Sequence, residues 1–106
     1  MPGGELGPGT VLGVDSSTQS TKVVARCVED GKVLASAHAP HPPSTPPRSE
    51  QDPAAWWGAL VDAVGQLGDL RRDVVAISVA AQQHGLVLTD DSGVPLRPAK
   101  LWNDTE

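Results

Sequence analysis

A short run of hydroxylated residues follows an aspartate near the start of the chain. It reads Asp15-Ser16-Ser17-Thr18-Gln19-Ser20-Thr21-Lys22 and comes directly after the apolar segment Thr10–Val14. The backbone N–H groups and hydroxyls of such a turn can donate to phosphate oxygens, and a carboxylate at a strand end suits Mg²⁺. The pattern therefore indicates a polyphosphate and magnesium site. The alternative is a plain hairpin turn whose Ser and Thr side chains bond their own backbone.

Two further polar segments lie later in the chain. Gln82-Gln83-His84-Gly85 follows the apolar run Val74–Val79, and ligands of open α/β sheets collect at the carboxyl ends of strands. Its amides and imidazole offer the donors and acceptors that a polyol needs. Leu101-Trp102-Asn103-Asp104 sets an aromatic face beside an amide and a carboxylate, which can hold a sugar. For the first segment the alternative is a polar surface loop. For the second it is a core tryptophan with two solvated neighbours.

Three strands are expected to position the first of these segments. Thr10–Val14 is short and apolar, as is typical of a strand buried on both faces. Lys22–Val28 and Lys32–Ala39 are predicted to pair as a hairpin through the Asp30-Gly31 signal. The segment Pro40–Pro47 holds five prolines and is expected to be an extended loop.

A helix and a fourth strand are predicted next. Asp52 can cap the helix, Pro53 suits its first turn, and Gly68 can end it. The spacing predicts an inward face with Trp57 pointing inward and Trp56 partly exposed. The members of that face are Trp57, Leu60, Val61, Val64 and Leu67. Val74–Val79 is then the most strand-like segment, followed by short strands around a turn at Asp90–Gly93. The order β-β-β-α-β predicts an α/β arrangement: an antiparallel meander, a crossover helix and a returning strand.

Composition excludes several classes of protein. The 106 residues carry a formal net charge of −5, which argues against a nucleic-acid partner. No apolar run is long enough to span a membrane and the N-terminus does not read as a secretory signal, so we expect a cytoplasmic protein without a membrane partner. The single cysteine, Cys27, fits a reducing compartment. With no Phe or Tyr and only three Trp, the core is thin, which suggests that the chain is part of something larger.

Four motifs together resemble the N-terminal portion of the FGGY carbohydrate kinases and, within that family, the xylulose kinases. The resemblance runs from about residue 11 to the last residue. The matching segments are Gly13 to Lys22, Glu50-Gln51-Asp52-Pro53 with Trp56-Trp57, Gln82-Gln83-His84-Gly85-Leu86, and Leu96-Arg97-Pro98-Ala99 through Leu101-Trp102-Asn103-Asp104. The family often has glycine where Ser17 stands, and its bacterial xylulose kinases often have methionine at position 83.

The resemblance implies the actin-like ATPase (ribonuclease H-like) fold, here as its incomplete N-terminal portion. It implies ATP-dependent phosphorylation of D-xylulose to D-xylulose 5-phosphate, with ATP and Mg²⁺ as cofactors. Asp15 matches the magnesium-associated carboxylate of the family. The implied phosphate-loop residues are Ser17, Thr18, Gln19, Ser20 and Lys22, and the implied sugar-contacting residues are Gln83, His84, Trp102, Asn103 and Asp104.

The resemblance also implies that the catalytic aspartate, the second phosphate loop and the adenosine pocket lie downstream of the matching residues. We therefore expect residues 1–9 to be a flexible tail and residues 10–106 to be a partial kinase domain, inactive alone. A kinase of the same family for ribulose, glycerol or gluconate is one alternative. A non-catalytic module that binds sugar or docks to another chain is the other. The sequence indicates no oligomeric state.

Overall fold

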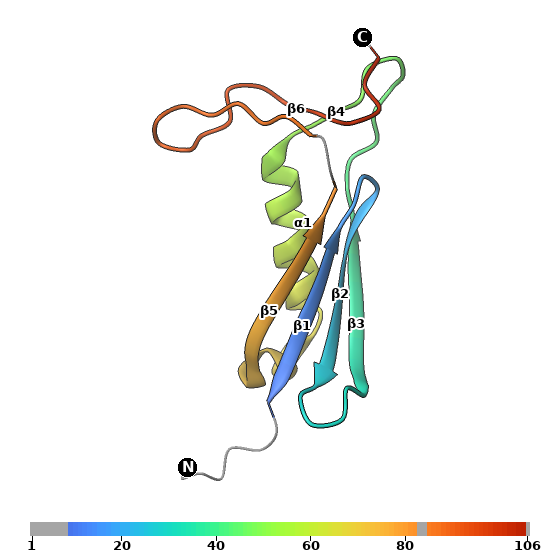
Figure 1. Cartoon of the computed structure of the whole chain (residues 1–106), viewed down its shortest axis with the longest axis vertical. Coiled ribbons are helices and arrows are strands. Elements are labelled where there is room, and N and C mark those ends of the chain that lie inside the picture. Colours follow the sequence, from blue (N-terminus) through green and yellow to red (C-terminus); the bar gives the residue numbers. More distant parts are fainter. Residues whose placement is uncertain (1–8, 83–84, 106) are drawn as a thin grey trace.

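The computed structural model describes residues 9–82 and 85–105. One layer is a four-stranded mixed sheet with the strand order β3-β2-β1-β5 (Figure 1). Its strands are β1 (Thr10–Ser16), β2 (Ser20–Cys27), β3 (Val33–Pro40) and β5 (Val74–Ala81). The first three run antiparallel as a meander, and β5 returns parallel to β1. This topology confirms the predicted β-β-β-α-β arrangement.

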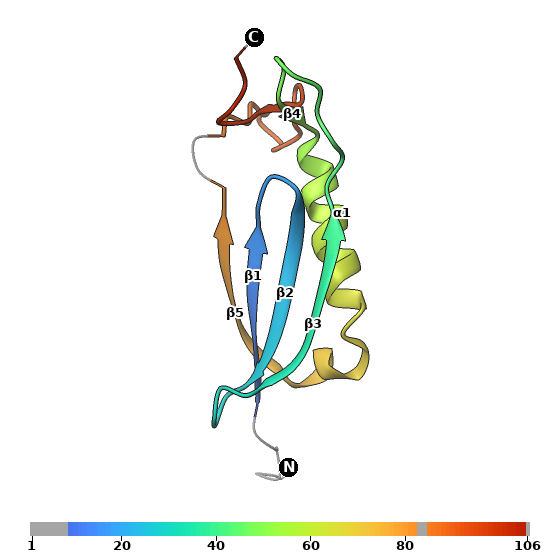
Figure 2. The same ribbon diagram turned by 90° about the vertical axis from the view of Figure 1, so that its right-hand side faces the viewer.

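Helix α1 (Pro53–Gly65) covers one face of the sheet over β2 and β3 (Figure 2). As predicted, the Ala54 N–H donates to Asp52 Oδ1 (2.9 Å) and a proline begins the helix. The helix ends before the predicted stop at Gly68, which has a φ of +60° and opens the 3₁₀ helix η2 (Gly68–Asp73). Within the described ranges, neither helix has the length and apolar character needed to cross a membrane.

The predicted inward face of α1 is partly wrong. Trp57 is 68% exposed and Val61 is 53% exposed, whereas Ala59 and Ala63 are buried. Trp56, expected to be the more exposed tryptophan, is half-buried. The two alanines lie on one side of the helix, one turn apart. Small side chains therefore face the sheet here. The prediction placed Trp57 and Val61 there because it rested on hydrophobicity alone.

The core between α1 and the sheet is thin, as the composition suggests. Its buried members are Leu12, Val14, Val23, Ala25, Ala39, Ala59, Ala63 and Leu67. In β1, Leu12 and Val14 are buried while Gly13 and Asp15 are exposed. The expectation that this strand is buried on both faces is therefore wrong for the structure described, because α1 covers one face only.

Strand β5 is the least covered part of the sheet. It lies at an edge, and Val75, Ile77 and Val79 are 68%, 57% and 61% exposed. Where one face of a sheet is solvated, its side chains are ordinarily polar, whereas these are valine and isoleucine. The Cα radius of gyration is 16.7 Å, against about 13 Å for a compact domain of this length. The sheet thus presents an apolar surface of the kind that further protein layers cover.

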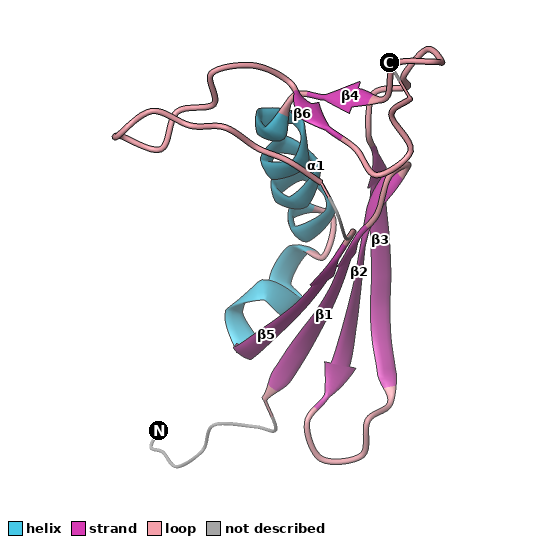
Figure 3. Cartoon of the chain, turned by 45° about the horizontal axis from the view of Figure 1, so that its top comes forward, coloured by secondary structure: helices cyan, strands magenta, loops and turns pink. Residues whose placement is uncertain are grey.

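A second, two-stranded sheet lies where α1 begins, at the end of the molecule toward which β1 and β5 run (Figure 3). Strand β4 (Glu50–Gln51) pairs antiparallel with β6 (Ala99–Lys100). The loop before β6 contains the predicted turn at Asp90–Gly93, where Gly93 has a φ of +82°. The sequence did not predict β4, because a two-residue strand has too short a pattern to detect. This small sheet brings the segment before α1 next to the last residues of the chain.

Candidate functional site

Strands β1 and β5 run parallel, so their carboxyl ends meet at the same edge of the sheet. Asp15, near the end of β1, lies opposite Lys22 of β2 and beside Ala80 of β5. Since side chains alternate along a strand, Asp15 lies on the face opposite to buried Val14. There it lines a groove of about 420 Å³ together with Lys22. A carboxylate and an ammonium group thus share one exposed surface.

The hydroxyl-rich turn is shorter than predicted and makes bonds within itself. β1 extends to Ser16 and β2 begins at Ser20, so only residues 17–19 form the turn. The Ser17 N–H and the Ser17 hydroxyl both donate to the Ser20 carbonyl, at 3.0 and 3.2 Å. This is the behaviour expected of the plain-turn alternative. It accounts for the Ser17 groups, while the Thr18 hydroxyl takes part in a longer-range contact.

Thr18 joins the turn to the other two predicted segments. Its hydroxyl donates to Gln82 Oε1 (3.3 Å), and it accepts from the indole N–H of Trp102 (3.4 Å). Trp102 is 62% exposed, so its ring face is open to solvent. Gln82 also lines a cavity of about 250 Å³ with Ser16 and Trp56. Three segments that are distant in the sequence therefore meet at one point above the strand ends.

The other two members of the last segment lie differently. Asn103 is exposed. The Asp104 carboxylate accepts from the Ser49 N–H (2.9 Å) and pairs with Lys100 (3.2 Å). In this structure the Asp104 carboxylate thus links the segment after β6 to the segment before β4. Its predicted contact with a sugar, like that of Asn103, stays a prediction.

Gln83 and His84, predicted to contact the sugar, lie outside the described residues. The described neighbours on either side are Gln82, whose N–H donates to the Ser16 carbonyl (3.0 Å), and Gly85. The roles assigned to Gln83 and His84 stay predictions.

Sequence reasoning missed two buried polar residues that hold the turn. Gln51 is 5% exposed and donates from Nε2 to the Thr18 carbonyl (2.8 Å). His41 is 6% exposed. Its backbone N–H donates to the Gln19 carbonyl (2.8 Å), and its ring Nε2 lies 2.7 Å from Thr21 Oγ1. A polar residue beside a proline-rich loop carries no periodic signal. The family match over Glu50–Pro53 was the only indication that Gln51 matters.

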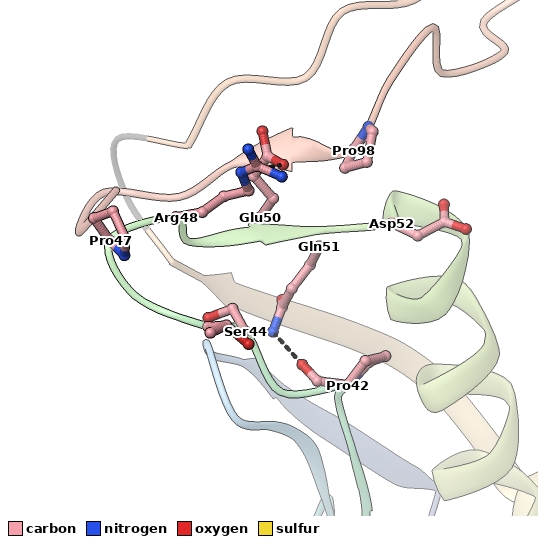
Figure 4. Close-up of a pocket in the computed structure, with 9 residues that line it drawn as sticks. Pro42, Ser44, Pro47, Arg48, Glu50, Gln51, Asp52 and Pro98 are labelled. Carbon is pink, nitrogen blue, oxygen red and sulfur yellow. Dashed lines mark hydrogen bonds and ion pairs between the residues drawn. The ribbon is translucent and has the colours of Figure 1, made fainter. Parts of the chain in front are cut away.

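A larger cavity, of about 560 Å³, lies beside the proline-rich loop rather than at the strand ends (Figure 4). Pro42, Ser44, Gln51 and Pro98 are among its lining residues. Gln51 reaches from β4 toward the Pro42 carbonyl, to which its Nε2 donates (3.1 Å). Gln51 therefore lies between this cavity and the turn.

Glu50 is the centre of a cluster of charged side chains near the site. Its carboxylate pairs with Arg97, with Lys100 (2.9 Å) and with Arg48 (3.8 Å). The hydrogen bond from Lys100 lowers the pKa of Glu50, and the charges of Lys100, Arg97 and Arg48 add to this effect. Glu50 is thus ionised at neutral pH and ties β4 to β6.

The described residues offer one carboxylate at the strand ends rather than a full cage for a metal ion. Across residues 9–82 and 85–105, no group of three or more His, Cys, Asp or Glu side chains could hold a metal ion. Magnesium bound with a nucleotide commonly uses one or two carboxylates, several waters and phosphate oxygens. An exposed Asp15 with Lys22 opposite it fits that mode, and a site built only from protein ligands does not fit.

The chain is similar to carbohydrate kinases over most of its length. Residues 10–106 match the N-terminal domain of the FGGY family of carbohydrate kinases. The chain is 51% identical over 94 residues to a xylulose kinase of Streptomyces coelicolor, covering 89% of this chain and 20% of that protein. A xylulose kinase sequence of Arthrobacter is also 51% identical over 94 residues, covering 89% of this chain and 93% of that sequence. The chain thus spans about a fifth of the length of the Streptomyces relative.

The solved structure of xylulose kinase from Bifidobacterium adolescentis has the same fold over this region. It superposes with a TM-score of 0.82 at 44% identity, covering 92% of this chain and 18% of that chain. This likeness confirms the predicted fold, the N-terminal portion of an actin-like ATPase.

Proposed function

Because the chain belongs to the FGGY family of carbohydrate kinases, we propose that it contributes the first part of an enzyme that phosphorylates D-xylulose. The product would be D-xylulose 5-phosphate, and the phosphoryl donor would be ATP with Mg²⁺. The observation that carries the proposal is the meeting of Thr18, Gln82 and Trp102. It joins the proposed phosphate turn to both proposed sugar segments at the carboxyl ends of parallel strands, where α/β proteins bind ligands.

Each residue has a role in this proposal that suits its chemistry. The exposed ring of Trp102 offers an apolar face for the C–H groups of the sugar. Gln82 and the predicted contacts Gln83 and His84 offer hydrogen bonds to its hydroxyls. Asp15 would hold the water shell of magnesium, and Lys22 would balance phosphate charge. When bound, ATP would supply the phosphoryl group and Mg²⁺ would neutralise the charge that develops during transfer.

We propose further that these residues act within a longer protein. The apolar side chains exposed on β5, Val75, Ile77 and Val79, support this view, because an edge strand of this kind is normally paired or covered. Phosphoryl transfer needs a base for the sugar hydroxyl and a nucleotide pocket in addition to one turn. The 106-residue chain alone is therefore expected to show no turnover. The alternative of a sugar-binding module predicts binding of D-xylulose without any dependence on further protein.

A chimeric enzyme tests the proposal. Residues 10–106 would replace the matching segment of the Streptomyces coelicolor xylulose kinase, to which the chain is 51% identical. ADP release would be measured with D-xylulose, ribulose, glycerol and gluconate. We expect the highest kcat/KM with D-xylulose and a kcat within the ordinary kinase range of about 1–100 s⁻¹. A folded chimera that turns over none of these sugars would overturn the proposal, and a preference for another polyol would correct the substrate.

A further inference from the structure

The Thr18 hydroxyl links Trp102 to Gln82 by hydrogen bonds in one direction. The Trp102 indole N–H donates to Thr18 Oγ1 (3.4 Å), and that hydroxyl donates to Gln82 Oε1 (3.3 Å). A hydroxyl has one donor and two acceptor positions, so both bonds can form at once. Both are longer than the usual O–H···O and N–H···O distances, so each is weak. The position of Thr18 therefore decides whether they form.

Gln51 fixes that position from beneath the turn. Its Nε2 donates to the Thr18 carbonyl (2.8 Å) and to the Pro42 carbonyl (3.1 Å). Its Oε1 accepts from the Trp56 indole N–H (2.8 Å). Both N–H donors and the carbonyl of this amide are thus engaged. The residue is 5% exposed, so water cannot readily replace the partners of its side chain.

We propose that Gln51 is a positioning residue that orients the Trp102 ring through Thr18, beside the β4–β6 pairing of the backbone. One short bond, donated by Gln51 Nε2, anchors the Thr18 carbonyl, and the long bond that the Trp102 indole N–H donates to the Thr18 hydroxyl orients the exposed ring. The use of that ring as a sugar platform rests on the proposed function. The positional link itself does not depend on it.

Two of the three tryptophans report on this link, and the third is a reference. In a ¹⁵N-labelled sample, the Trp56 indole resonance reports the bond to Gln51 and the Trp102 resonance reports the bond to Thr18. Trp57, 68% exposed, is an internal reference. Gln51→Glu keeps an acceptor for Trp56 but removes the donor to Thr18. We expect it to shift the Trp102 indole proton upfield and to leave the Trp57 resonance in place.

Two variants of Thr18 keep the inference testable if Gln51→Glu does not fold. Thr18→Val removes the hydroxyl at nearly constant shape and should shift the Trp102 indole proton upfield while Trp56 stays in place. Thr18→Ser restores the hydroxyl and should return the Trp102 resonance toward its original position. An unchanged Trp102 resonance in Thr18→Val, or in a folded Gln51→Glu, would overturn the inference.

A titration with D-xylulose separates this inference from the proposed function. In the unmodified chain we expect the sugar to shift the Trp102 indole and the Ser17 and Ser20 amides. In Thr18→Val, D-xylulose should shift the Trp102 indole resonance but not the Ser17 and Ser20 amide resonances. Amide shifts as large as those in the unmodified chain would contradict the link. If the sugar shifts no resonance at all, sugar binding by this chain fails, and the positional link is decided by the variants alone.

Discussion

His41 Nε2 lies 2.7 Å from Thr21 Oγ1, and both side chains are buried beneath the hydroxyl-rich turn. The other ring nitrogen, Nδ1, is also buried and has no hydrogen-bond partner in the described part of the chain. Among the described residues, Thr21 is therefore the hydrogen-bond partner of the imidazole. Since the His41 N–H bonds the Gln19 carbonyl, this pair supports the base of the turn.

Replacing Thr21 by valine should destabilise the chain. The change keeps the shape but leaves the His41 ring without its partner, at a cost of about 1–3 kcal/mol in the free energy of unfolding. Urea unfolding followed by circular dichroism measures this cost. The double variant Thr21→Val with His41→Leu should lose less than the sum of the two single changes, because two apolar groups need no hydrogen bond.

A matched control for this prediction is Thr89→Val, at an exposed position. It should alter the free energy of unfolding by no more than about 0.5 kcal/mol. Equal effects of Thr21→Val and Thr89→Val would show that the buried hydrogen bond contributes nothing to stability.

The link between β4 and β6 should weaken in acid. Lys100, Arg97 and Arg48 lower the pKa of Glu50 from its ordinary value of 4.5. A carboxyl with a lowered pKa in the folded state stabilises fully above its ordinary value, and the effect is lost as the pH falls through the lowered pKa. Glu50→Gln should therefore be less stable than the unmodified chain at pH 7, and the difference should shrink below pH 4.5.

Thermal unfolding from pH 3 to pH 7 tests this dependence. Asp69→Asn is the matched control, because the Asp69–Arg72 pair is almost fully exposed and pairs of that kind contribute about 0–1 kcal/mol. A stability difference between Glu50→Gln and the unmodified chain that stays constant over this range would contradict the role of the Glu50 charge.

The sequence predicted the parts of the fold that have local signals. Asp52 and Pro53 marked the start of α1, and the Asp-Gly pair marked the hairpin where Gly31 has a φ of +73°. Burial was harder to predict, because it depends on which surfaces meet. Trp57 is exposed since only the side of α1 that bears Ala59 and Ala63 lies against the sheet.

The candidate site could be predicted in outline only. The three polar segments were recognisable because each follows an apolar run or contains a motif. The supporting residues Gln51 and His41 were not, since they act through backbone carbonyls brought close by the fold. Asp104 was assigned by motif to the sugar, while the structure gives its carboxylate to Ser49 and Lys100.

Two glycine-to-alanine changes should alter stability in opposite directions. Gly31 has a φ of +73°, which costs an L-residue roughly 1–2 kcal/mol, so Gly31→Ala should destabilise the hairpin. Gly58 is exposed within α1, and a Cβ there would meet no described atom within 4 Å apart from its chain neighbours and the backbone of its own helix. Gly58→Ala should stabilise the chain by about 0.5–1 kcal/mol. Chemical denaturation measures both, and a shift of the same sign in the two variants would contradict the prediction.

The strongest test of the proposed phosphate side is Asp15→Asn in the chimeric xylulose kinase. If Asp15 orients the metal shell, removing its charge should act on the transition state more than on sugar binding. We expect kcat to fall at least ~10²-fold, or about 2.7 kcal/mol, with little change in KM for D-xylulose. Steady-state kinetics across a magnesium titration measures both constants.

Asp30→Asn is the control, since Asp30 lies in the hairpin turn at the far end of β2 and accepts the Lys32 N–H through Oδ1, which asparagine retains. It should leave kcat unchanged at every magnesium concentration. An Asp15→Asn enzyme that is folded and as fast as the Asp30→Asn enzyme at low magnesium would leave Asp15 a structural residue. The hydroxyl-rich turn would then be the plain hairpin turn that its Ser17–Ser20 hydrogen bonds allow.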